Sequence, residues 1–212
     1  RVVAYDWWWR VEYLDAAGDV VATSANEIHI PVGQPVAMRL DSADVIHAFW
    51  VPRLAGKTQM IPGQTNQQWL QADVPGVYRG QCTQYCGVQH ARMALEVIAQ
   101  SQAEFDAFLR AESLPAQADD MRLQSAGGQV FMAHCAACHT VRGTPAMGDH
   151  APDLTHVSSR RLLAAGQLDN TLENLQRWIV QAQTIKPGSR MPDIALTAAE
   201  LKDVSQLLAQ LK

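Results

Sequence analysis

The sequence predicts two domains of different fold class, an all-β domain over residues 1–112 and an all-α domain over residues 125–212. Up to about residue 100, short runs of Val, Ile, Trp and Tyr alternate with breaks that contain Pro or Gly. That pattern is typical of an antiparallel sandwich or barrel. In the second half, helix-capping sequences and helical periodicity replace it. Residues 113–124 (SLPAQADDMRLQ) are polar and contain a proline, which indicates a linker.

The β pattern divides into six expected strands, followed by one helix. In chain order the strands are Val2–Tyr13, Glu27–Val32, Val36–Leu40, Val45–Val51, Asn66–Asp73 and Met93–Ala99. Ser101 and Glu104 have the spacing of a capping box, in which each residue satisfies a free backbone N–H group of the other. The sequence therefore predicts a helix that starts there and ends near Glu112.

Three helices are expected in the second domain. The first, Gly127–His134, lies directly before a pair of cysteines. An Asn-x-x-Glu motif at Asn170 is expected to cap a second helix that runs through Gln183. A Thr-x-x-Glu motif at Thr197 is expected to cap a third helix that continues to the C-terminus. Apolar residues at helical spacing give this last helix one buried face.

Composition and charge limit the classes of function. No apolar run approaches the roughly 18 residues that cross a bilayer. Residues 1–112 carry 8 Lys/Arg against 12 Asp/Glu, a net charge of −4, whereas residues 113–212 carry 9 of each. This acidity argues against nucleic acid, which requires basic patches, and suits a basic protein partner. Because the chain opens with Arg1 and not Met, we expect that an upstream segment has been removed.

The second of two cysteine pairs gives the more specific pattern. The segment CAACH, from Cys135 to His139, has the C-x-x-C-H form of a c-type haem attachment sequence. Cys135 and Cys138 would form thioethers to the haem vinyl groups, and His139 would bind the iron. A redox dithiol would require a βαβ context, and a zinc site would require two further ligands at matching spacing. Neither is found, so haem attachment is the preferred interpretation.

The haem iron needs a sixth ligand, for which Met191 is the first candidate. It lies in the segment KPGSRMP, a Pro- and Gly-containing loop between two expected helices. A thioether opposite histidine raises the reduction potential of the iron. Met147 is the alternative ligand. The backbone carbonyl of Pro152 is expected to orient the ring of His139.

The first cysteine pair lies in a stretch of soft metal ligands. This stretch contains the thiols of Cys82 and Cys86, the imidazole of His90 and the thioether of Met93. Soft ligands of this kind select copper over hard cations. A blue-copper site uses one cysteine, whereas two allow a pair of sulfur atoms to bridge two copper ions. Each copper then needs an imidazole, and His90 supplies only one.

The second imidazole must come from outside this stretch, and His47 is the expected source. His47 lies well upstream in the aromatic segment DVIHAFW, as the distant histidine of a cupredoxin does. His29 is the alternative, in a strand that lacks this aromatic context. A disulfide between the two cysteines is another interpretation of the pair. It would leave His90 and Met93 without a role.

These residues resemble a known family. The segments DVIHAFW and KTQMIPG and the C-x-x-x-C-G-x-x-H-x-x-M stretch resemble the copper domain of cytochrome c oxidase subunit II. The C-terminal hundred residues resemble the cytochrome c domain that is fused to this subunit in caa-type oxidases. The resemblance covers nearly the whole chain. It implies a cupredoxin Greek-key barrel followed by a class I cytochrome c domain, with two coppers and one covalent haem c.

The resemblance also implies residue roles. Cys82 and Cys86 would bridge the two coppers, with His47 and His90 as one ligand each and Met93 and the Gln84 carbonyl as weak ligands. The segment DWWW matches the family's W-x-W motif, whose first aromatic residue carries incoming electrons, so that residue here is Trp7. Gln84 and Gln59 depart from the family, in which many members have Glu and Asp. Those carboxylates help to hold an interfacial magnesium, and the resemblance does not extend to that metal.

The implied function is electron transfer on the outer face of a bacterial plasma membrane, with upstream transmembrane helices as the anchor. A soluble cytochrome c or another respiratory donor would reduce the haem, and the copper centre would deliver electrons to catalytic subunit I. The alternative is the corresponding module of a nitric oxide reductase. The chain itself is not expected to reduce oxygen, because its remaining histidines are too few and too scattered for a second haem with copper.

Overall fold

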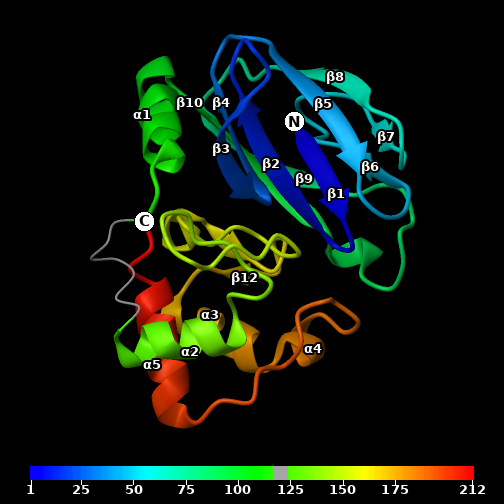
Figure 1. Cartoon of the computed structure of the whole chain (residues 1–212). Helices are drawn as coiled ribbons and strands as arrows, with labels where there is room; N and C mark the ends of the chain where they lie inside the picture. The colour runs from blue at the N-terminus through cyan, green and yellow to red at the C-terminus, as the bar shows by residue number, and fades with distance from the viewer. Residues whose placement is uncertain (117–123) are drawn as a thin grey trace. The chain divides into compact units, whose positions relative to one another are not determined.

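The computed structural model describes residues 1–116 and 124–212, which form two compact units (Figure 1). The first unit contains residues 1–113 with 165–167, and the second contains the other described residues, 114–116, 124–164 and 168–212. Residues 117–123 of the expected linker lie outside the described residues. Every helix in the described part of the chain is too short or too polar to cross a membrane.

The first unit is rich in β structure. Its strands are β1 (Val2–Tyr5), β2 (Trp8–Leu14), β3 (Val20–Ala25), β4 (Glu27–Pro31), β5 (Val36–Ser42), β6 (His47–Phe49), β7 (Thr58–Met60), β8 (Asn66–Leu70), β9 (Gly76–Gln81) and β10 (Ala94–Gln100). They form a five-stranded sheet in the order β3-β2-β1-β5-β8 and a three-stranded sheet in the order β4-β10-β9. Strands β6 and β7 pair separately.

The structure confirms the β-rich class but corrects several details. The expected strand Val2–Tyr13 is two antiparallel strands, because the chain reverses at residues 6–7 and pairs Tyr5 with Trp8. Pairing is not all antiparallel, since β1–β5 and β4–β10 are parallel. Neither sheet closes on itself, so a closed barrel is not seen. Strands β3, β7 and β9 were not predicted, since they are short or interrupted by small and polar residues.

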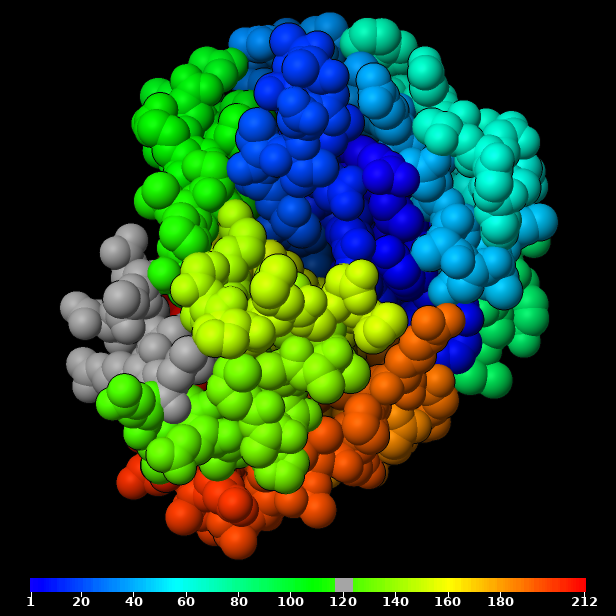
Figure 2. All heavy atoms as spheres, viewed as in Figure 1, coloured from blue at the N-terminus to red at the C-terminus, as the bar shows by residue number. Residues whose placement is uncertain are grey.

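The two sheets share one apolar core, which also contains Cys82, Cys86 and Met93. Its largest fully buried side chains include those of Trp9, Leu40, Phe49, Met93 and Leu95, and Cys82 and Cys86 belong to the same cluster. Helix α1 (Gln102–Ser113) begins at the predicted capping box, in which the Ser101 N–H donates to Glu104 Oε2 at 2.9 Å. In Figures 1 and 2 this helix lies at the edge of the unit, against β3 and β4.

The second unit is helical. It contains α2 (Ala126–His134), α3 (Leu172–Val180), α4 (Ala182–Ile185) and α5 (Ala198–Leu208), with one short pair of strands, β11 (Leu162–Leu163) and β12 (Leu168–Asp169). Helices α2 and α3 both pack against α5. The core between them contains Phe131, Leu175, Val204 and Leu208. The capping box at Thr197 is present as predicted.

The second predicted helix cap is wrong by one residue. Thr171, and not Asn170, caps α3 by accepting the backbone N–H of Asn174. The side chain of Asn170 instead donates to the carbonyls of Val157 and Arg160, both at 2.8 Å. The helix ends at Val180 instead of continuing to Gln183, and the short helix α4 follows after a break.

Candidate metal centre

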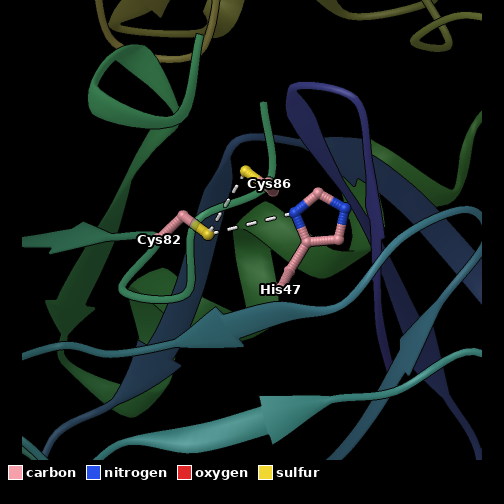
Figure 3. Close-up of side chains that lie close together, drawn as sticks. All are labelled: His47, Cys82 and Cys86. Atoms are coloured by element: carbon pink, nitrogen blue, oxygen red, sulfur yellow. Dashed lines mark hydrogen bonds between the residues drawn. The ribbon is translucent and has the colours of Figure 1, made fainter. Parts of the chain in front are cut away.

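The cysteine-rich loop between β9 and β10 meets strand β6 at a buried cluster of metal-binding side chains. Cys82 Sγ lies 3.8 Å from Cys86 Sγ and 3.9 Å from His47 Nδ1 (Figure 3). The ligand atoms of these three residues all lie within 4.8 Å of one another. Both cysteines are free thiols, and their separation is far beyond the roughly 2 Å of a disulfide bond.

Three further groups surround the two sulfur atoms. Cys86 Sγ lies 3.6 Å from His90 Nδ1 and 4.0 Å from Met93 Sδ. The backbone carbonyl oxygen of Gln84 lies 3.3 Å from Cys82 Sγ. His90 opens a short 3-10 turn that ends at Arg92 and leads into β10. Each thiol therefore has its own imidazole, one from β6 and one from the loop.

Burial and hydrogen bonds control the charge of this cluster. A hydrogen bond from Cys86 lowers the pKa of the Cys82 thiol, and the same coupling raises the pKa of Cys86. The first thiol proton is therefore lost easily and the second is retained. Burial alone would lower the pKa of His47, but its hydrogen bonds to Asp44 and Cys82 outweigh burial and raise it to about 9.

The donor set fits copper. Two thiols, two imidazole nitrogens and one thioether are soft or borderline ligands, which copper prefers to the oxygen ligands of hard cations. Four of these five side chains, those of His47, Cys82, Cys86 and Met93, are buried.

The alternative histidine, His29, lies in a different part of the domain. Its ring stacks on Phe108 of α1 with the centroids 3.7 Å apart. Its Nε2 lies 3.0 Å from Glu27 Oε1, and its Nδ1 lies 3.2 Å from Gln100 Oε1. The structure thus brings His47, and not His29, to the cysteines.

Two contacts at this cluster were not predicted from the sequence, that of Asp44 with His47 and that of Trp7 with Cys86. Asp44 Oδ1 lies 2.9 Å from His47 Nε2, on the side of the ring that faces away from Cys82. Trp7 is buried and donates its Nε1–H to the carbonyl oxygen of Cys86 at 2.8 Å. The only signal for Asp44 was its position three residues before His47. No local pattern could pair Trp7 with a residue 79 positions away.

The haem attachment sequence follows directly on helix α2. Cys135 is the C-cap residue of α2, and its N–H donates to the carbonyl of Phe131. His139 Nδ1 lies 2.7 Å from the carbonyl oxygen of Pro152, so Nδ1–H donates to it. This leaves Nε2 of the ring available to iron. Burial lowers the pKa of His139, which favours the neutral ring that metal binding requires.

The two candidate methionines differ in exposure. Met191 is half-buried and packs against the core of the helical unit, whereas the Met147 side chain is 80% exposed. Gln183 Nε2 donates to the carbonyls of Ser189 at 2.8 Å and Met191 at 2.6 Å, which holds the loop around Met191. The residues present fit a haem c with two cysteines, one histidine and a methionine on a supported loop.

A buried cluster of copper-type ligands in one unit and a haem attachment sequence in the other indicate a two-domain protein with one copper-type site and one haem site. Residues 16–101 match the family described as cytochrome c oxidase subunit II, periplasmic domain, and residues 124–212 match the cytochrome c family. The chain therefore joins a periplasmic domain of the cytochrome c oxidase subunit II family to a cytochrome c domain, as predicted. These domains imply a binuclear copper A centre and a haem c, which confirms the predicted cofactors.

Curated relatives named cytochrome c oxidase subunit 2 match this chain over its full length. The chain is 37% identical over 213 residues to cytochrome c oxidase subunit 2 of Alkalihalophilus pseudofirmus, covering 100% of this chain and 60% of the relative. It is 30% identical to the subunit of the same name from a Bacillus species (strain PS3), covering 100% and 62%. The chain thus spans about three fifths of the length of these relatives.

Among solved structures, the crystal structure of the periplasmic domain of subunit II of cytochrome oxidase from Bradyrhizobium japonicum is similar to the chain. The two are 27% identical, with a TM-score of 0.49, covering 52% of this chain and 89% of that one.

Proposed function

We propose that this chain relays electrons as part of subunit II of a haem–copper cytochrome c oxidase. Electrons enter at the cytochrome c domain, move to the copper domain and leave for the haem of catalytic subunit I, where oxygen is reduced. When bound, the haem and the copper pair supply one-electron redox chemistry. This chain would contribute the relay and not the reduction of oxygen.

The observation that carries this proposal is the pairing of thiols with imidazoles. Cys82 lies beside His47, Cys86 lies beside His90, and the two sulfur atoms are 3.8 Å apart. A single-copper site needs only one thiol, whereas this arrangement provides two thiols, each with its own imidazole. Cys82 and Cys86 would bridge two coppers, and each histidine would bind one of them.

Two weaker ligands complete the proposed copper site. Met93 Sδ lies on the Cys86 side and the carbonyl of Gln84 on the Cys82 side. The Gln84 ligand is a backbone atom, so the side chain at this position is free to differ from the Glu of many family members. Gln59 likewise stands where many family members have an Asp. The proposal therefore does not include the interfacial magnesium that those carboxylates help to hold.

In the helical unit, Cys135 and Cys138 would hold the haem covalently while His139 and Met191 bind its iron. The Pro152 carbonyl fixes the His139 ring through Nδ1, which is the usual role of a hydrogen-bond partner behind a metal-binding histidine. The exposure of Met147 and the packing of Met191 favour Met191 as the sixth ligand. In this proposal the helical unit is a class I cytochrome c and the β unit is a cupredoxin.

Trp7 is the proposed route into the copper site. Its indole donates a hydrogen bond to the backbone of Cys86, a proposed bridging ligand, so the path from ring to copper contains few atoms. Trp7 is 9% exposed, so a small part of this residue remains at the protein surface.

The proposed partners are catalytic subunit I and a soluble cytochrome c or another respiratory donor. Exposed apolar side chains flank the copper ligands in sequence, namely those of Val45, Ile46, Tyr85 and Val88. They suit burial against another protein. We further propose that the chain works on the extracytoplasmic face of a bacterial membrane, held there by helices upstream of Arg1. The reported relatives are all oxidase subunits, which favours an oxidase over the alternative of a nitric oxide reductase.

Flash reduction of the haem in the metal-loaded chain tests this proposal. The account predicts that copper is then reduced at a rate independent of protein concentration, because donor and acceptor belong to one chain. The same chain without copper is the control, since its haem should remain reduced for much longer. Haem that stays reduced in the wild-type chain, with copper present, would contradict the proposed relay.

A further inference from the structure

We propose that Asp44 is a positioning residue of the copper site. Its carboxylate fixes the ring of His47 and links that ring to the turn that carries Trp7. The inference rests on the copper site of the proposed function and adds a residue to it. His47 is completely buried, and its two ring nitrogens face different partners. Nδ1 lies 3.9 Å from Cys82 Sγ, and Nε2 lies 2.9 Å from Asp44 Oδ1.

The contact with Asp44 decides which nitrogen of His47 can bind metal. A carboxylate only accepts hydrogen bonds, so Nε2 must carry the hydrogen that it donates to Asp44 Oδ1. The lone pair of the neutral ring is then on Nδ1, the atom that faces Cys82. A carboxylate behind a metal-binding histidine also fixes the plane of the ring and increases its basicity. Asp44 thus leaves Nδ1 of His47 as the nitrogen that can bind metal and holds that nitrogen toward Cys82.

The second oxygen of Asp44 reaches a different part of the chain. The backbone N–H of Asp6 donates to Asp44 Oδ2 at 2.8 Å, while the N–H of Val45 donates to Oδ1 at 2.8 Å. Asp6 directly precedes Trp7, and it lies 38 residues from Asp44 in the sequence. One carboxylate therefore joins the turn between β1 and β2 to a proposed copper ligand.

The same turn is held on the other side of the copper site by Trp7. Its Nε1–H donates to the Cys86 carbonyl, and its ring lies against Gly87. A Cβ atom at Gly87 would lie 2.8 Å from Trp7 Cζ2, so the loop and the ring have no spare room between them. Residues 6 and 7 are thus attached to His47 through Asp44 and to Cys86 directly. A displacement of this turn at Trp7 would therefore also displace the contact between Asp44 and His47.

This role requires two acceptor oxygens. An asparagine has the same size but only one acceptor, because its other terminal atom is a donating NH₂ group. Asp44→Asn must therefore place a donor against either the His47 ring or the Asp6 N–H. Asp44→Ala removes both contacts. Asp41→Asn is a matched control, because its side chain is 15% exposed against 13% for Asp44 and it contacts Arg1 instead of the copper site.

The experiment measures copper retention of the full chain against a competing chelator, together with its visible spectrum and thermal midpoint. Loss of such a partner typically costs roughly 10- to 100-fold in metal affinity. We expect a loss of about this size and an altered copper spectrum for Asp44→Asn and Asp44→Ala, with Asp41→Asn unchanged. If Asp44→Ala fails to fold, Asp44→Asn, which keeps the size and one acceptor, decides the question.

Two results would contradict the inference, and they can be told apart. If both Asp44 variants retain wild-type copper affinity and spectrum while only their thermal midpoints fall, Asp44 is merely structural. The proposed function would then stand. If the wild-type chain itself forms no copper pair, the proposed function fails and this inference fails with it.

Discussion

The copper cluster and the haem attachment sequence are built in opposite ways. The copper cluster joins His47 and Cys82, 35 residues apart, and Trp7 and Cys86, 79 residues apart, inside a buried core. The haem sequence places three functional groups within five consecutive residues, and Cys138 is exposed. One site therefore exists only when the whole β unit is folded, whereas the other is carried by a local segment and completed by covalent bonds.

This difference predicts how each site responds to damage. A change to one buried ligand should disturb the copper cluster as a whole, because each sulfur atom has contacts to several of the other groups. A change in the helical unit should instead remove one function at a time, since covalent attachment does not depend on the axial ligands.

Cys82→Ser should have the largest effect. We expect the copper pair to collapse to a single-copper centre or to be lost, because one thiolate cannot bridge as two do. Copper content and the spectrum of the oxidised protein report the change. Cys135→Ser is the matched comparison and should leave copper unaltered while the haem keeps a single thioether. An unchanged delocalised copper signal in Cys82→Ser would refute the bridging assignment.

Met191→Ala should produce a large change at the haem while leaving it attached. The sixth position opens, and the reduction potential falls, because the thioether favours reduced iron. Axial ligands tune haem potentials over about 0.8 V, so the shift should be easily measured by redox titration. Met147→Ala, at a residue that is 80% exposed, should change neither spectrum nor potential. The reverse result would move the ligand to Met147.

Gly148→Ala should destabilise the helical unit, although it replaces none of the side chains proposed to hold the haem. A Cβ atom at Gly148 would lie 2.4 Å from the backbone carbon of Cys138, and backbone cannot move aside as a side chain can. Overpacking of this kind costs about 1–3 kcal/mol in the free energy of unfolding. Gly56→Ala, where a Cβ meets nothing within 4 Å, is the control. Equal unfolding midpoints in denaturant for the two variants would contradict this packing.

Ionic strength should have the smallest effect on the step between the two units. Linked units reach an effective concentration on the order of millimolar, so this step needs little electrostatic steering. Reduction by an external basic cytochrome should depend more strongly on salt, because residues 1–112 carry a net charge of −4 and charges are screened beyond about 8 Å. Flash reduction at low and high salt separates the two rates. A steep fall of the internal rate would contradict the tether argument.

Local patterns explain which parts of these sites could be predicted from the sequence. The haem motif and the capping boxes at Ser101 and Thr197 lie within a few residues, so their chemistry is visible directly. The other features depend on residues that are far apart in the sequence, so no local pattern predicts them. The parallel pairing of β1 with β5 and the contact of Trp7 with Cys86 arise only when remote segments meet.

The two histidines considered for copper show the same limit. His29 and His47 both lie in short apolar strands, and only the aromatic neighbours of His47 distinguished them in the sequence. The fold separates them completely, because His29 lies under α1 against Phe108 while His47 faces Cys82. The carboxylate behind His47 was not predicted, because a spacing of three residues between Asp44 and His47 does not by itself determine where the histidine ring points.

The ratio of copper to haem iron in the purified, fully loaded chain tests the central claim most directly. Two thiols, each with its own imidazole, predict about two copper ions for each iron, with one electron shared across the pair in the oxidised protein. Elemental analysis gives the ratio, and electron paramagnetic resonance shows whether the electron is shared. A ratio near one, or a signal from a single isolated copper, would contradict the account.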